Sequence, residues 1–178
     1  LQAKSLLTAI DASRQYRLME SIRLYGMQQL ADASETGSAF EAIAGWLATV
    51  AQAFVTAPMS VPHEVRRQVV KQAGTLRVVC EWTASSKDDR HVLLSTALAI
   101  AAANRGFVAD GRKVLRDALS HPGGAPGHRC TALDRAGWFA GFQGDFAEGI
   151  SYARHGLRIA RELGDPALIT NCLATLAC

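Results

Sequence analysis

Three side chains in the second half of the chain could together hold a ligand. Trp138 and Phe142 lie four residues apart and Asp134 lies one turn earlier, so the three share one face of a predicted helix. An aromatic pair beside a carboxylate suits a peptide, a partner helix or a small cationic or amphipathic effector. The alternative interpretation is that Trp138 packs in the core between neighbouring helices.

The sequence contains no set of residues with the spacing of a catalytic centre. A phosphate-binding loop needs a glycine followed by Lys and then Ser or Thr, and no glycine in this chain is followed by Lys. The Gly-x-Ser-x-Gly elbow, the His-Glu-x-x-His pair and a cysteine–histidine dyad with a supporting carboxylate are missing too. Asp88 and Asp89 are more simply a helix-capping cluster than an acid and base pair. We therefore expect no enzymatic activity and no cofactor bound in this segment.

The basic residues do not indicate a nucleic-acid interface. The net charge of +3 is small and dispersed along the chain. A basic stripe on one predicted helix comprises Arg66, Arg67, Lys71 and Arg77. Because Glu64 and Glu81 dilute this stripe, we interpret it as a solvent-exposed helix face.

Composition predicts a cytoplasmic protein with no membrane partner. The chain has 178 residues, 49% of them hydrophobic, which is enough to form a core without metal or disulfide staples. Its longest uncharged stretch, 42–62, is interrupted by polar residues, glycine and proline, so we expect no membrane span and, from the first residues, no secretory signal. Four scattered cysteines predict buried, reduced thiols. Because the chain begins with Leu1, we expect it to be part of a longer protein.

The first 90 residues predict a short hairpin followed by helices. Two apolar runs within 5–18, separated by a polar turn at 11–14, are typical of a β-hairpin, and helical spacing follows over 19–31. Ser38 and Glu41 form a capping-box pattern at the start of a helix that runs to about residue 55. Prolines within 56–62 end that helix, the next is predicted over 63–83, and a polar break follows at 84–89.

From residue 90 onward the sequence contains a repeat. A shift of roughly 38 residues superposes small residues and turn glycines: Ala99 on Gly137, Gly106 on Gly144 and Gly111 on Gly149. Small residues at such positions let two helices cross closely, and glycines at turns supply a positive φ at little cost. The repeat therefore predicts pairs of antiparallel helices joined by tight turns.

Each repeat unit is predicted to hold a helix A, a turn and a helix B. The units cover about 91–120 and 129–163, and a third starts at 166. The predicted A helices are 91–104 and 129–142, and the predicted B helices are 107–119 and 146–163. Gly164, Asp165 and Pro166 supply a helix terminator, an N-cap and a first helical residue in succession, which marks the boundary before the third unit.

These helix pairs resemble tetratricopeptide repeats in the sequence Gly144-Asp145-Phe146, in the small residues at 137 and 149, and in Leu157. Residues 105–115 and 136–146 are similar to the repeat region of large bacterial regulators, in which a STAND-class signalling ATPase precedes a winged helix and a repeat array. LuxR-type ATP-dependent transcriptional regulators are of this kind. Residues 4–7 and 16–25 resemble the wing and the final helix that close the ATPase module.

The resemblance implies a mainly α fold, in which a TPR-like α-hairpin superhelix follows a short β-hairpin wing and a helix. The implied domains are the C-terminal part of a winged helix at 1–33 and helical repeats at 39–178. In tetratricopeptide arrays the A helices line the concave face. The repeat register then gives five candidate binding residues on that face: Asn104, Thr131, Asp134, Trp138 and Phe142.

The resemblance also implies a function. The chain would be a non-enzymatic sensor or scaffold segment of an ATP-dependent bacterial transcriptional or signalling regulator. Its partners would be a protein or small-molecule effector and the ATPase and DNA-binding modules of the same longer chain, with a homo-oligomer as a further arrangement. ATP would bind upstream of Leu1. The alternative is a free-standing repeat adaptor that binds a protein segment in its concave groove.

Overall fold

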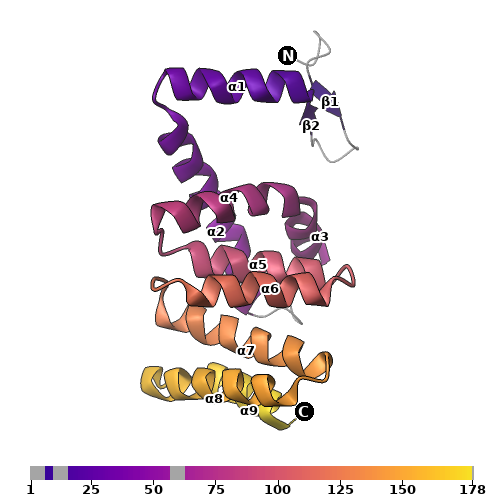
Figure 1. Cartoon of the computed structure of the whole chain (residues 1–178), viewed down its shortest axis with the longest axis vertical. Helices are drawn as coiled ribbons and strands as arrows, with labels where there is room; N and C mark the ends of the chain where they lie inside the picture. The colour runs from indigo at the N-terminus through magenta and orange to yellow at the C-terminus, as the bar shows by residue number, and fades with distance from the viewer. Residues whose placement is uncertain (1–6, 10–15, 57–62, 178) are drawn as a thin grey trace. The chain divides into compact units, whose positions relative to one another are not determined.

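The computed structural model describes residues 7–9, 16–56 and 63–177, which form nine helices and two short strands (Figure 1). The prediction of a mainly α fold is confirmed. By their contacts the residues divide into two units, Leu1–Ala42 and Ile43–Cys178, and this division falls inside helix α2.

The first unit holds a short two-stranded ribbon and one helix. Strand β1 (Leu7–Ala9) pairs antiparallel with β2 (Tyr16–Leu18), and the predicted turn at 11–14 lies outside the described residues. Helix α1 (Glu20–Asp32) follows, and none of residues 19–42 is buried. A winged-helix domain needs its helices and its wing to share a core. The predicted β-hairpin wing is therefore wrong: the described residues are almost all helical, and two three-residue strands followed by a helix with no buried residue do not make a winged helix.

Helix α2 (Thr36–Thr56) begins before the predicted capping box. Ser38 lies in its first turn and donates its hydroxyl to the carbonyl of Glu35 at 2.9 Å, so it cannot be the N-cap, and this prediction is wrong. Within the second unit α2 buries one face, which includes Leu47 and Phe54. By length and composition alone α2 could also cross a membrane, a test that the core helix of a globular domain passes equally.

The single helix predicted over 63–83 is two helices. α3 (His63–Lys71) and α4 (Ala73–Ser86) are separated by Gln72, whose amide donates to two carbonyls of the preceding turn at 3.0 and 3.1 Å. α4 continues beyond the predicted end and stops at Lys87, which adopts a left-handed conformation with φ of 56°. The polar break before the repeats is consequently shorter than predicted.

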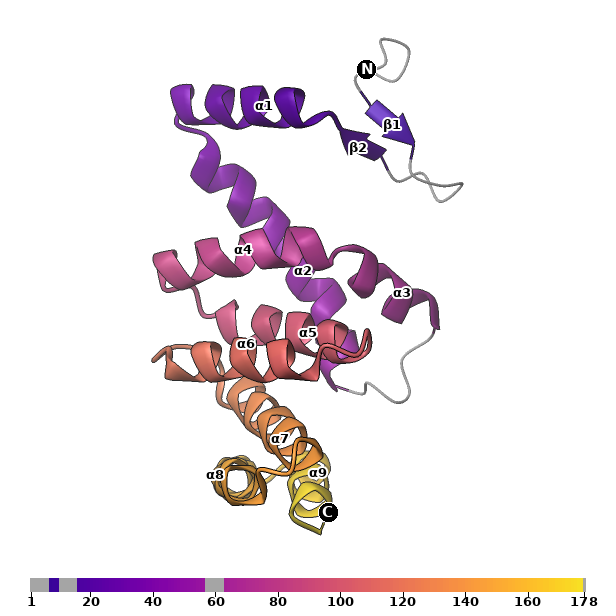
Figure 2. The same ribbon diagram turned by 45° about the vertical axis from the view of Figure 1, so that its right-hand side comes forward.

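The predicted helix pairs are present after residue 90. In chain order they are α5 (His91–Ala103), α6 (Val108–Ser120), α7 (Pro126–Phe142), α8 (Phe146–Leu163) and α9 (Pro166–Ala177), which follow one another as successive hairpins (Figure 2). Gly106 and Gly144 have φ of 89° and 81° in the two turns, as predicted. α7 begins three residues earlier than predicted, because Pro126 occupies its first turn, where proline needs no amide partner.

The two helices of each pair cross at the predicted small residues. A Cβ atom added at Gly111 would lie 2.8 Å from the carbonyl oxygen of Ala99, and one added at Gly149 would lie 3.0 Å from the carbonyl oxygen of Gly137. Phe139 packs with Ala99 in the core between the first and second pairs. The crossing residues therefore set how closely the helices stack, and this prediction is confirmed.

Candidate binding groove

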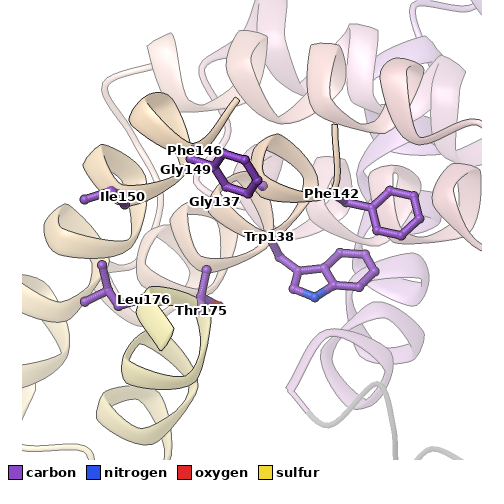
Figure 3. Close-up of a pocket in the computed structure, with 9 residues that line it drawn as sticks. Gly137, Trp138, Phe142, Phe146, Gly149, Ile150, Thr175 and Leu176 are labelled. Carbon is purple, nitrogen blue, oxygen red and sulfur yellow. The ribbon is translucent and has the colours of Figure 1, made fainter. Parts of the chain in front are cut away.

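A groove opens where the second helix pair meets α9. Its volume is about 410 Å³, and side chains from α7, α8 and α9 surround it (Figure 3). The lining residues are Gly137, Trp138, Gly141, Phe142, Phe146, Gly149, Ile150, Thr175 and Leu176. Figure 3 shows the rings of Trp138 and Phe142 on one side, and Ile150 and Leu176 on the other.

Trp138 and Phe142 form a stacked aromatic pair on α7. Their ring centroids are 5.5 Å apart and their planes are inclined by 21°. The side chains remain 43% and 69% exposed, respectively. Phe139, the neighbour of Trp138 in sequence, is 2% exposed and meets the indole edge-on at 5.7 Å. The core-packing interpretation therefore fits Phe139 and does not fit Trp138.

The two junctions between successive helix pairs differ in two ways. At the junction of the first and second pairs, Phe139 reaches within 3.1 Å of a Cβ added at Gly111. The three atoms nearest a Cβ added at Gly149 all belong to α7, so α9 brings no atom as close to this glycine as Phe139 comes to Gly111. An aromatic ring thus covers the first glycine crossing, whereas the second crossing lies at the groove.

The second difference concerns a charged side chain at the first junction. Arg112 of α6 pairs with Asp145, the N-cap of α8, and with Glu148 in its first turn, and it donates to the amide oxygen of Gln143 at 3.1 Å. Bonds from Arg112 lower the pKa of both carboxyl groups. The corresponding position in the second pair is Ile150, which lines the groove and offers no such bridge. The first junction is therefore held by ion pairs, whereas the second has an apolar side chain at the equivalent position.

The five predicted binding residues do not all come together. Trp138 and Phe142 line the groove. Asp134 is 4% exposed and accepts a hydrogen bond of 2.6 Å from the hydroxyl of Thr175, so its carboxylate is engaged beneath the groove instead of open to a ligand. Thr131 is buried and donates to the carbonyl of Gly127 at 3.0 Å. Asn104 is exposed at the end of α5 and is not among the lining residues.

Sequence reasoning missed the parts of the groove that lie outside α7. Phe146 and Ile150 come from α8, and Thr175 and Leu176 come from α9. Periodicity within one helix cannot show which side chains of other helices face it. A comparison of the two units position by position contained a signal, because Ile150 stands where the first unit has Arg112.

A second, smaller cavity of about 290 Å³ lies among α4, α5 and α6 and holds two histidines. The Thr83 hydroxyl donates to the carbonyl of Cys80, so His91 must donate its Nδ1 proton to Thr83, at 3.0 Å. His121 donates from Nε2 to the carbonyl of Ala84 at 2.9 Å, and the two imidazole centroids are 4.9 Å apart. Burial, and then the nearby His121, lower the pKa of His91.

This cavity has the features of a structural site. Burial raises the pKa of the Cys80 thiol to about 11, so the reactive thiolate is disfavoured there. The histidine hydrogen bonds tie α5 and the segment after α6 to the end of α4. Just after α4, the Asp88 carboxylate pairs with the Arg90 guanidinium and accepts a hydrogen bond from the Arg90 amide at 2.8 Å. Among residues 7–9, 16–56 and 63–177, no cluster of three His, Cys, Asp or Glu could hold a metal ion.

Comparison of the chain with models of protein families, with curated proteins and with solved structures finds no match. The groove at α7, α8 and α9 is therefore the feature from which a function can be inferred.

Proposed function

We propose that this chain is a non-enzymatic helical-repeat binding module whose groove takes a small, neutral, aromatic or aliphatic ligand. The observation that carries the proposal is the exposed, stacked pair of Trp138 and Phe142 at the side of a 410 Å³ groove. Aromatic rings exposed to solvent lack the apolar contacts that a bound ligand would supply. The volume falls within the range of small-molecule sites, about 300–1,000 Å³.

The lining residues favour a neutral ligand. None of them carries a charge, and the hydroxyl proton of Thr175 is already donated to Asp134. A charged group placed among Phe146, Ile150 and Leu176 would lose its hydration without gaining a partner. This chemistry corrects the expectation of a cationic effector, because that expectation needed the Asp134 carboxylate to face the ligand.

The groove also suits a compact ligand better than a long peptide helix. Its apolar walls come from three different helices, and at Gly141 an added Cβ would meet nothing within 4 Å. A flat planar group can approach the backbone there because no side chain covers it. The groove thus favours a ring that lies against Gly141 and stacks beside Trp138.

The proposed setting of this module is a sensor segment of a longer, cytoplasmic ATP-dependent regulator. The support is the resemblance of residues 105–115 and 136–146 to the repeats of such proteins, in which ATPase and DNA-binding modules occupy other parts of the chain. Effector binding would then bias the ATPase between resting and assembled states. The reading frame upstream of Leu1 tests this setting. A phosphate-binding loop in the same frame supports it, and a start codon directly before Leu1 contradicts it.

Binding itself can be tested with N-phenyl-1-naphthylamine, a neutral aromatic probe whose fluorescence rises in apolar surroundings. We expect the chain to bind this probe and Trp138→Ala to weaken binding by about tenfold, the worth of one aromatic stacking partner. Trp46→Ala is the matched control, because Trp46 is a comparably exposed tryptophan, at 45%, outside the groove. Equal losses in the two variants, or no loss in Trp138→Ala, would contradict the proposal.

A second variant tests the shape of the site without removing an aromatic residue. Gly141→Leu adds a side chain at a lining position where a new Cβ meets nothing within 4 Å, and we expect it to displace the probe while the fold stays intact. A control substitution, Leu173→Phe, enlarges an exposed α9 side chain outside the lining and should leave binding unchanged. If an amphipathic helical peptide competes with the probe more strongly than small neutral aromatics do, the peptide adaptor replaces the small-ligand proposal.

A further inference from the structure

Two cysteines meet in the core between α7 and α9. Cys130 and Cys172 are both 0% exposed, and their Sγ atoms are 3.8 Å apart, a distance at which one thiol can donate a weak hydrogen bond to the other. The Sγ of Cys130 also lies 3.2 Å from the carbonyl oxygen of Gly156. They are 42 residues apart in sequence, so only the stacking of the repeat helices brings them together.

The neighbouring helix leaves room for this pair. A Cβ atom added at Gly156 of α8 would lie 3.1 Å from the Sγ of Cys172 and 3.5 Å from the carbonyl oxygen of Cys130. Leu157 and Ala160 complete the apolar cluster around the two sulfurs. The thiols therefore lie in a small apolar chamber at the contact of three helices.

The pair lies one helical turn from the wall of the groove. Asp134 follows Cys130 by four residues and accepts the hydrogen bond from Thr175, which follows Cys172 by three. Thr175 and Leu176 form the α9 side of the groove. Cys172 is the only buried residue of α9 among those described, so few core contacts hold this helix in place.

We propose that Cys130 and Cys172 are an oxidative modification site, at which a peroxide closes a reversible disulfide that ties α7 to α9. The sulfurs would move from 3.8 Å to the bond length of about 2 Å, a shift that side-chain rotation and a small displacement of α9 can supply. Because α9 buries a single residue, a transient local opening gives a small oxidant access to the thiols.

The chemistry balances with hydrogen peroxide as the oxidant. The Cys130 sulfur attacks one peroxide oxygen, the O–O bond breaks, and water leaves, so that Cys130 becomes a sulfenic acid. The Cys172 sulfur then attacks the Cys130 sulfur, the S–O bond breaks, and a second water leaves with the remaining thiol proton. The two thiols lose two electrons and two protons, and the peroxide is reduced to two waters.

The order of attack follows from the hydrogen bond between the thiols. Donation from Cys172 lowers the pKa of Cys130, whereas the same bond and burial raise the pKa of Cys172. Cys130 is therefore the first of the two to ionise and react. Closure of the disulfide would fix the α9 side of the groove at a constant distance from the stacked pair on α7.

The experiment uses the full chain with Cys178→Ser, which removes the one other thiol that shares a tryptic peptide with Cys172. After exposure of the folded protein to hydrogen peroxide, we expect a cross-linked pair of peptides that contain Cys130 and Cys172. Dithiothreitol should separate them. The oxidised protein should also melt at a higher temperature than the reduced form, because a cross-link restricts the unfolded chain.

Control variants separate this site from general oxidation. Cys172→Ala in the same background should remove the cross-link, and circular dichroism would check that its helices remain. The proposal is overturned if the peptides join only after denaturation, if peroxide produces sulfinic or sulfonic acids without a cross-link, or if Cys80 is the partner. Probe binding to the groove is measured separately, in the reduced protein. If no disulfide forms, the proposed binding function is unaffected, and if the probe does not bind, the proposed disulfide is unaffected.

Discussion

Substitution of two adjacent aromatic residues tests the placement of the groove most directly. Trp138 and Phe139 are neighbours in sequence on α7, yet Trp138 is 43% exposed and Phe139 is 2% exposed. Replacement of each by alanine removes an aromatic side chain, exposed in one case and buried in the other. We expect Phe139→Ala to destabilise the protein strongly and Trp138→Ala to destabilise it much less.

The expected magnitudes follow from burial. A fully enclosed aromatic side chain buries about 150–250 Å², and each Å² is worth about 25 cal/mol. Phe139 also leaves a cavity against Gly111, so its loss should cost about 3–5 kcal/mol. Trp138 buries little more than half of its surface and keeps Phe142 as a neighbour, so its loss should cost about 1–2 kcal/mol.

Urea unfolding, followed by far-ultraviolet circular dichroism, gives both free energies of unfolding on one scale. At about 2–4 °C of melting temperature per kcal/mol, the two variants should also differ by roughly 4–8 °C in thermal scans. A Trp138→Ala cost equal to that of Phe139→Ala would show that the indole is part of the core. That result would refute the assignment of Trp138 to an open groove.

Three further predictions concern the helix contacts. Gly111→Ala should cost about 1–3 kcal/mol in urea unfolding, because the new methyl group meets the α5 backbone, whereas Gly127→Ala, in open space, should cost nothing measurable. His91 has a lowered pKa in the folded protein, so its contribution to the free energy of unfolding is present above about pH 6.5 and is lost as the pH falls. His91→Gln should flatten this dependence of the free energy of unfolding on pH. The control His155→Gln, at an exposed histidine, should leave it unchanged. Arg112→Gln should lower the melting temperature by an amount that shrinks in high salt; an unchanged difference in salt would count against the ion pairs at the first junction.

The helix pairs could be predicted because their signals are local. The left-handed φ of 65° at Gly164 and the Asp165 side chain, which accepts two amide hydrogen bonds at 2.9 and 3.1 Å, place the end of α8 and the start of α9 where the sequence alone puts them. The small residues at the helix crossings could also be predicted, because the repeat places a small residue at the same position in both units.

The elements before residue 90 were harder to predict for an equally physical reason. Apolar spacing continues through Gln72, so nothing local marks the break between α3 and α4; both helices contact α5, and this tertiary packing determines the break. Ser38 and Glu41 match a capping box in letters, but the helix starts earlier. The hairpin pattern at 5–18 predicts local pairing and cannot predict whether a core lies beneath it.

Only part of the candidate site could be predicted from the sequence. The i, i+4 spacing correctly joined Trp138 to Phe142, whose rings stack. The same spacing joined Asp134 to them and could not reveal that Thr175, 41 residues away, engages its carboxylate. That single long-range hydrogen bond decides whether the groove suits a cationic or a neutral ligand.

The repeat lets neighbouring junctions between helix pairs differ in chemistry while the helices themselves stay alike. Both B helices follow a turn glycine and cross their A helix at a small residue, yet the equivalent position holds Arg112 in the first pair and Ile150 in the second. Arg112 forms ion pairs with the next helix pair, whereas Ile150 lines a groove. A chain of this design could acquire, lose or reshape a ligand site at any junction by exchanging one side chain on a B helix.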